Sequence, residues 1–324
     1  MLSGAGRAIL AEYYTLLLLA FLLISVRAYV RIRITKGNFQ SWSWDDSSII
    51  LAWIFLLIGA ILIQIEVNLG LGKHIKNLNN GERDALDILK YNTFFQMVNV
   101  LCTLVTKISI SFYILRIRDD KRVRWTLATL MTFMTLATIA VILVLSLSCR
   151  PLRKLWEPEL PGSCLPLTTV YNVAYVQSAF TIVIDIGLSL VPILILWNVR
   201  IKPGRKTLIC TLMSLGFIAT ISNALRNKFQ TELTTKDFTY DMTGVTVVAI
   251  LELSSGIIAA CIPACIPILK IRKIKGERST AQGYSYSRTI TRSVVTPKVT
   301  ANSFTSRSEV LPKSGDEDDM IPLR

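Results

Sequence analysis

The stretch Ile49–Leu69, IILAWIFLLIGAILIQIEVNL, decides the fold class, because Glu66 is its only ionisable residue. An α-helix rises about 1.5 Å per residue, so about 20 such residues cross the hydrocarbon core of a bilayer. A helix in the bilayer satisfies its own peptide groups, which water cannot reach there. We therefore predict that this stretch is a transmembrane helix.

Six further apolar runs flank this stretch along the chain. The predicted spans, in order, are Ile9–Val30, Ile49–Leu69, Thr93–Leu115, Thr126–Leu147, Tyr171–Val199, Thr207–Leu225 and Val245–Leu269. Their residues lack the regular polar and apolar alternation that membrane β-barrels require. We predict an all-α membrane protein in which residues 9–269 form a seven-helix bundle.

The positive charges indicate topology rather than nucleic-acid binding. The net charge is +14, yet Lys and Arg are concentrated between the apolar runs and in the C-terminal segment. The segments after the first, third, fifth and seventh spans hold eighteen of them, against eleven on the other side. Because short cytoplasmic loops carry an excess of Lys and Arg, we predict that residues 1–8 lie outside the cell and the C-terminus in the cytosol.

Residues 270–324 differ in character from the bundle, since they are rich in Ser, Thr and charged residues. Such a segment buries too little apolar surface to fold, so we predict a disordered cytosolic tail. Its first part, Lys270–Arg278, is basic and is expected to be attracted to anionic lipid headgroups. Together with the basic loops, it is the expected contact surface for a cytosolic signalling partner.

Ionisable residues inside spans are costly in a bilayer and are therefore the first candidates for function. Lys107 lies 14 residues after Thr93, and Asp185 lies 14 residues after Tyr171, so both are about 21 Å from the outer ends of their spans. We expect an ion pair between them if their helices are neighbours. Such a pair either fixes helix register or acts as a switch. Alternatively, Lys107 extends to the cytosolic interface and leaves Asp185 unpaired.

Three more charged candidates lie nearer the predicted outer surface. They are Glu66 in the second span, Glu252 in the seventh and Arg226 just after the sixth. With the amide side chains of Gln64, Asn99 and Gln177, these residues are candidates to line a cavity in the outer half of the bundle. An ordinary set of interhelical hydrogen bonds is an equally good interpretation.

Two cysteines near the predicted outer surface are candidates for a disulfide. Cys149 closes the fourth span, and Cys164 lies in the external loop that follows. A bond between them would close a loop of about 16 residues and stabilise it by about 3 kcal/mol through chain entropy. Cys102, in the outer half of the third span, competes for Cys149.

Several chemistries lack the residues that they need. The chain has one His, and it contains no GxSxG, GxxxxGK[ST] or HExxH motif. The seventh span has no lysine before Lys270 that could form a Schiff base with retinal. We therefore expect neither catalysis nor a bound cofactor or metal.

An ordered series of residues resembles the fungal integral membrane rhodopsin-domain family. The matching features are Arg27-Ala-Tyr-Val-Arg31, Asp45–Asp46, Gly70-Leu-Gly72-Lys-His74, Lys107-Ile-Ser109, Phe112-Tyr113-Ile-Leu-Arg116, Cys149-Arg-Pro151, Trp156 to Cys164, Asp185, Pro192, Trp197, Gly216, Arg226, Glu252 and Cys261-Ile-Pro263. The resemblance implies seven helices, a disulfide in an external loop and a receptor-like role without retinal. Neither a DRY nor an NPxxY signature is present.

Three hypotheses about function follow from the topology, the intramembrane charges and the resemblance. The first is an orphan receptor-like sensor of an extracellular small molecule or surface cue, located in the plasma membrane. The second is a small-solute transporter or channel, because such proteins also place charges inside the membrane. The third is a membrane scaffold without a signalling role.

Overall fold

The structure is a computed structural model that describes residues 4–34, 43–75, 78, 81–117, 120–196, 217–218, 220–228, 239–240 and 242–262. The chain divides into two units, Met1–Ile271 and Arg272–Arg324. The second unit and the rest of the predicted tail lie outside the described residues, so the disordered tail stays a prediction.

The described residues are almost entirely helical. The helices are α1 (Gly4–Tyr29), which continues as the π-helical turn η1 (Val30–Ile34), α2 (Trp44–Leu69), α3 (Glu82–Ile117), α4 (Lys121–Ser146) and α5 (Leu167–Leu196). Residues 217–228, except 219, are also helical, and a final helix covers Met242–Ile262. Six helices in the described part of the chain are long and apolar enough to cross a membrane. The helical segments follow the seven predicted spans in order, which confirms the all-α membrane fold.

Each of the helices α1–α5 begins earlier than hydropathy predicts, and α2 and α3 show why. α2 begins at Trp44 rather than Ile49, so Asp45 and Asp46 lie in its first turn. Carboxylates are favourable at a helix N-terminus, and the backbone N–H of Ser43 donates a hydrogen bond to Asp46 Oδ2 at 3.3 Å. α3 begins at Glu82 rather than Thr93. Hydropathy reports only the lipid-embedded part of a helix, so polar turns at its end are missed.

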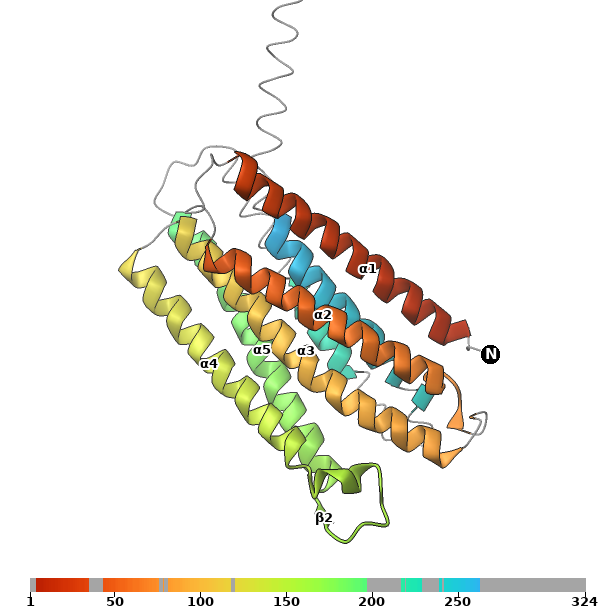
Figure 1. Cartoon of the computed structure of the whole chain (residues 1–324). Coiled ribbons are helices and arrows are strands. Elements are labelled where there is room, and N and C mark those ends of the chain that lie inside the picture. The colour runs from red at the N-terminus through yellow and green to blue at the C-terminus, as the bar shows by residue number, and fades with distance from the viewer. Residues whose placement is uncertain are drawn as a thin grey trace, which may run out of the picture. The chain divides into compact units, whose positions relative to one another are not determined.

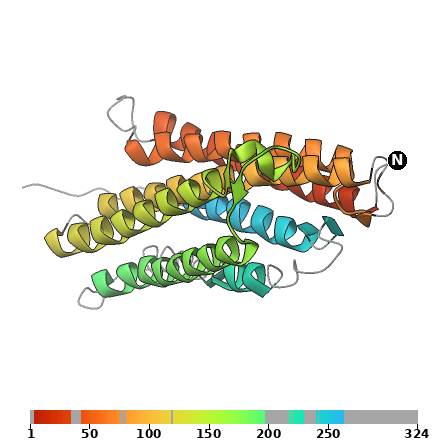
Figure 2. The same cartoon turned by 90° about the horizontal axis from the view of Figure 1, so that it is seen from below.

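Consecutive helices pack side by side, from α1 on α2 through to α4 on α5 (Figure 1). α3 is central, because Phe95 and Cys102 belong to the core shared with α1, α2 and the final helix. Leu104 and Ile114 of the same helix belong to a second core with α4 and α5. The final helix, drawn in blue, lies between the α1–α3 group and α5 (Figure 2). The order of packing thus places α3 and the final helix in the interior.

Apolar side chains cover much of the surface of the bundle. Among them are Leu18 and Leu22 of α1, Phe133 and Leu136 of α4, and Val183 of α5, each about half exposed or more. An apolar surface of this extent is unusual for a soluble protein and is expected for helices that contact lipid.

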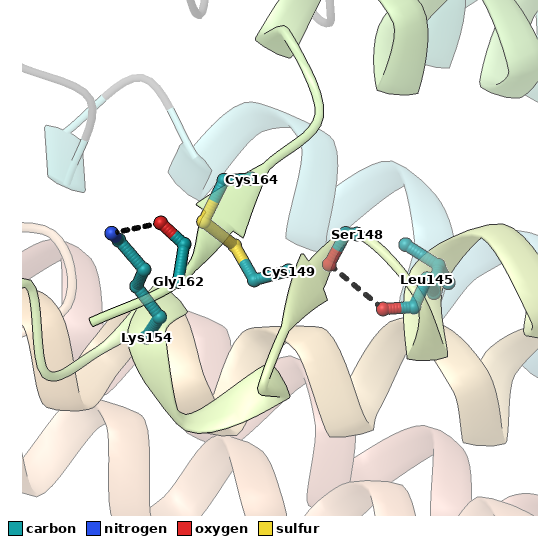
Figure 3. The surroundings of a disulfide bond; sticks show 6 residues. All are labelled: Leu145, Ser148, Cys149, Lys154, Gly162 and Cys164. Carbon is teal, nitrogen blue, oxygen red and sulfur yellow. Dashed lines mark hydrogen bonds between the residues drawn. A yellow bond between two sulfur atoms is a disulfide. The ribbon is translucent and has the colours of Figure 1, made fainter. Parts of the chain in front are cut away.

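A two-stranded hairpin follows α4. Strand β1 (Cys149–Arg150) pairs antiparallel with β2 (Ser163–Cys164), and Cys149 lies opposite Cys164. A disulfide joins these two residues, as predicted (Figure 3). Cys102 is a buried free thiol that donates to the backbone oxygen of Ala52 at 3.3 Å, so it does not compete for Cys149. We call the end of the bundle that carries this hairpin the hairpin end. We call the end of the bundle where α1 finishes the Arg27 end.

Candidate functional site

The structure brings Lys107 and Asp185 together in the middle of the bundle. Lys107 Nζ of α3 lies 2.9 Å from Asp185 Oδ1 of α5, and both side chains are buried. Charges removed from water are tolerated only when they are paired, so α3 and α5 are held in one relative register here. Of the two predicted placements of Lys107, the structure has the paired one.

The ion pair continues into a network that reaches two more helices. The Asn223 side-chain amide donates to Glu252 Oε1 at 3.0 Å and to Asp185 Oδ2 at 3.5 Å. Arg226 Nη1 lies 3.2 Å from Glu252 Oε2, and Arg226 Nη2 donates to Asn223 Oδ1 at 3.1 Å. Two cations and two anions therefore cancel around one amide. We call Lys107, Asp185, Asn223, Arg226 and Glu252 the central network.

The sequence predicted four members of the central network but missed Asn223. The prediction searched for ionisable residues, whereas Asn223 is uncharged. The available signal was its position within the predicted sixth span, three residues before Arg226, because a polar amide in a membrane helix needs a partner. Asn223 is fully buried and is the residue that links the two ion pairs.

A second charged cluster lies at the Arg27 end. Arg27 Nη2 contacts Asp45 Oδ2 at 2.7 Å and Arg27 Nε contacts Asp46 Oδ1 at 2.8 Å, while Arg27 Nη1 donates to the backbone oxygen of Ala260 at 2.6 Å. Arg31 Nη2 is 3.1 Å from Asp45 Oδ2, and the partly exposed Arg116 of α3 lies at the edge of the cluster. We call Arg27, Arg31, Asp45, Asp46 and Arg116 the Arg27 cluster.

Sequence reasoning counted Arg27 and Arg31 among the charges that set topology and among the features of the family resemblance, without predicting their contacts. Arg27 is instead 2% exposed, and Asp45 is fully buried. The signal that could have revealed the cluster was the acidic pair directly before an apolar run, facing the arginines that end the preceding run. Because adjacent antiparallel helices bring those ends together, opposite charges there are expected to meet.

The remaining predicted residues do not share one site. Glu66 is fully buried in α2, and its carboxylate lies beside the side chain of Asn92 of α3, close enough to interact with it. Gln64 faces outward and binds the Tyr14 hydroxyl. Asn99 is buried in α3, and only Gln177 of the six predicted cavity residues lines the cavity described next.

A cavity of about 400 Å³ lies at the hairpin end, between α3, α4, α5, the final helix and the hairpin. This volume is within the range of small-molecule sites. Most lining side chains are apolar, and the polar ones are Asn92, Thr93, Gln96, Ser148, Lys154 and Gln177. Met242 and Val245 line it from the final helix, and the Cys149–Cys164 disulfide forms part of its wall.

The hairpin is held over this cavity by specific contacts. Trp156 packs against Phe94 of α3 with ring centroids 6.3 Å apart, and Lys90 Nζ lies 5.5 Å from the centroid of the Trp156 ring. The Lys154 ammonium donates to the backbone oxygen of Gly162 (Figure 3). These contacts and the disulfide fix the wall of the cavity relative to α3.

Comparison with known proteins identifies relatives of this sequence. The profile of the fungal rhodopsin domain matches residues 26–271, which is most of the chain. A SAT4 family membrane protein of Emericella nidulans is 26% identical over 117 residues, covering 36% of this chain and 28% of the relative. Fugralins biosynthesis cluster protein 2 of Gibberella zeae is 26% identical over 138 residues, covering 40% and 33%.

The chain therefore spans only about a third of the length of these curated relatives. No solved structure matches this chain. The seven helical segments, the apolar surface and the match across residues 26–271 agree with one another. The chain belongs to the fungal rhodopsin domain family.

Proposed function

We propose that this protein is a receptor-like sensor, in which a small molecule from outside the cell binds the cavity at the hairpin end. One observation carries the proposal, namely that the final helix takes part in all three features described above. It lines the cavity through Met242 and Val245, contributes Glu252 to the central network, and offers the Ala260 carbonyl to Arg27. A movement of this helix at the cavity therefore changes contacts at both charged clusters.

The spacing of residues supports this coupling. Val245 and Glu252 are seven residues apart, as are Val100 of the cavity and Lys107 of the central network. Seven residues are about two helical turns, so each pair lies on one face of its helix, about 10 Å apart along the axis. A ligand that spreads α3 from the final helix would thus act directly above the charged residues.

The charged contacts suit a two-state element. Buried ion pairs depend steeply on distance, and they stabilise whichever helix arrangement keeps them paired. A ligand shifts the population only if it binds one arrangement more tightly than the other.

The basic connections at the Arg27 end, with Arg122 and Arg124 at the start of α4, would contact a cytosolic partner. The role is non-enzymatic, and the plasma membrane is the expected location.

A cell-based experiment tests the sensor role. A strain that lacks the protein is complemented with the wild type, Glu252→Gln or Gln64→Leu at equal amounts of surface-labelled protein. Transcription is then measured after exposure to a panel of extracellular small molecules. We expect a cue-dependent response that the wild type and Gln64→Leu restore and Glu252→Gln reduces, because Gln64 faces outward. If no cue distinguishes the deletion strain from the wild type, the sensor role is wrong.

Transport of a small molecule is the second candidate. It is favoured by the intramembrane charges and by a relative whose printed name places it in the fugralins biosynthesis cluster. Purified protein in liposomes separates the two functions, since a receptor carries no flux of the molecule that it binds. Flux that is lost in Glu252→Gln would favour transport instead of sensing.

A further inference from the structure

We propose that the cavity at the hairpin end selects a small amphipathic molecule with an apolar body and a neutral or anionic oxygen-bearing head group, and rejects amine cations. This inference rests on the proposed function, in that it names the class of ligand that the same cavity would take. It is carried by the charge and hydrogen-bonding character of the cavity wall.

The apolar body of the ligand follows from the larger part of the wall. Leucine and valine side chains from α3, α4 and α5, together with Met242 and Val245 of the final helix, make up most of the lining. Burial of apolar ligand surface against such a wall is favourable in proportion to its area. A cavity of about 400 Å³ restricts the ligand to a single small molecule.

The oxygen-bearing head group follows from two amides. Gln96 of α3 and Gln177 of α5 line the cavity from facing helices, and neither side chain makes a hydrogen bond within the described residues. By contrast, the hydroxyls of Thr93 and Ser148 already donate to the backbone oxygens of Leu89 and Leu145. Because a carboxamide both donates and accepts, Gln96 and Gln177 can bind a hydroxyl, a carbonyl or a carboxylate.

The preference for an anion over a cation follows from Lys154. Among the described residues that line the cavity, Lys154 carries the one charge. No Asp or Glu is among these lining residues. A cation that enters an apolar cavity loses its hydration and needs a carboxylate partner, which this wall does not supply. An anionic head gains a charge-assisted hydrogen bond from Lys154, whose ammonium the hairpin holds at Gly162.

Three probes that differ only in their head group test this selectivity. They are 4-phenylbutanoate, 4-phenylbutan-1-ol and 4-phenylbutylamine, which carry an anion, a neutral hydroxyl and a cation. Binding to the full chain in nanodiscs is measured by saturation-transfer NMR with competition. We expect the acid and the alcohol to bind at one shared site and the amine not to compete. Equal or tighter binding of the amine, or binding of none of the three, would overturn the proposal.

Variants locate the binding to this cavity. Lys154→Gln should weaken binding of the acid by about tenfold, because it removes one charge-assisted hydrogen bond. The affinity for the alcohol should not change. Arg153→Gln is the matched control, since Arg153 lies in the same turn but pairs with Glu157 in solvent. The double variant Gln96→Leu/Gln177→Leu should weaken binding of both the acid and the alcohol by about tenfold. Gln64→Leu, which lies outside the cavity, should leave both affinities unchanged.

Filling the cavity supplies a test that does not depend on the head group. Val245→Trp, or the milder Ala174→Leu, should abolish binding of both probes while the thermal transition of the protein is retained. Unchanged binding in a folded filling variant would place the probes elsewhere and overturn the proposal. These measurements are independent of signalling, so selective binding without a cellular response contradicts only the sensor role. A response to amines lost in Val245→Trp contradicts only the ligand class.

Discussion

The two charged clusters of this protein use similar residues in different ways. In the Arg27 cluster, one guanidinium contacts two carboxylates and a helix carbonyl at 2.6–2.8 Å, and the Ser109 hydroxyl donates to the backbone oxygen of Asp45. In the central network, contacts run from 2.9 to 3.5 Å and depend on the Asn223 amide. The contacts of Arg27 itself are therefore shorter than those of the central network, whereas the ion pairs of Arg31 and Arg116 in the same cluster are 3.1–3.6 Å long.

This difference suggests a division of roles between assembly and switching. When a side chain such as Arg27 makes several short contacts to different helices, removing one of them costs much folding stability. Such a side chain therefore has mainly a structural role. In the central network the contacts are longer and both ion pairs meet at one amide. Its side chains can therefore rearrange at a smaller cost in free energy. The predictions below test this division, from the largest effect on stability to the smallest.

Replacing Arg27 should have the largest effect. Arg27→Leu removes the shortest contacts of Asp45 and Asp46 and leaves them with the longer ones to Arg31. Removing one partner of a buried ion pair costs about 3–5 kcal/mol. We expect a strong loss of folded protein at the cell surface and of monomer in size-exclusion chromatography. Arg153→Leu is the control, because the exposed Arg153–Glu157 pair contributes at most about 1 kcal/mol.

Rescue separates charge from packing at the same position. Neutralising one partner in Arg27→Met/Asp46→Asn should recover a substantial part of the lost stability, because the remaining Asp45 carboxylate keeps Arg31 as its partner at 3.1 Å. If this double variant is as unstable as Arg27→Leu, the bond to the Ala260 carbonyl, rather than the ion pairs, holds the helices together.

Breaking the Lys107–Asp185 pair should have an intermediate effect. Lys107→Met and Asp185→Leu are each expected to destabilise the protein by about 2–3 kcal/mol, and the double variant by less than their sum. Asp185 retains Asn223 when Lys107 is removed, which limits the loss. The free energy of unfolding in a double-mutant cycle measures the coupling. Strictly additive effects would mean that the two charges do not interact in the membrane.

Removing the linking amide should have the smallest effect on stability and a clear effect on signalling. Asn223→Leu leaves both ion pairs intact and removes hydrogen bonds to charged side chains. Such bonds contribute about 1.5–3 kcal/mol each, although the contact of Asn223 with Asp185 is long at 3.5 Å. Because every charge keeps its ion-pair partner, we expect a smaller loss of thermal stability than in the ion-pair variants, together with a changed response to the cellular cue. Asn68→Leu, at an exposed amide of α2, is the matched control. Equal responses of wild type and Asn223→Leu would mean that the central network is only structural.

Hydropathy predicted the helices well because lipid imposes a simple demand on each segment separately. Any run of about 20 apolar residues must be helical to satisfy its peptide groups, whatever its neighbours are. Equal depth likewise predicted that Lys107 could meet Asp185, and one external compartment favoured the bond between Cys149 and Cys164. These predictions needed only the depth and compartment of each residue, apart from the condition that the helices of Lys107 and Asp185 are neighbours.

The cavity and the Arg27 cluster could not be predicted from the depth of each residue in the membrane alone. Gln64 and Gln177 looked alike in the sequence, yet Gln64 binds Tyr14 on the outside and Gln177 lines the cavity. Arg27 resembled the loop arginines around it, yet it is almost completely buried. The rotation of each helix about its own axis decides between these outcomes, and hydropathy is almost independent of that rotation.

The sequence by itself determined that this is a membrane-spanning helical protein with ionisable residues inside its spans, because the cost of exposing peptide groups to lipid is local and large. Only the packing of the helices decided that Lys107 pairs with Asp185. Only the tertiary structure decided that one helix, Met242–Ile262, joins the cavity, the central network and the Arg27 cluster. That arrangement depends on which faces of α3, α5 and the final helix meet, and the packing of side chains from several helices at once selects those faces.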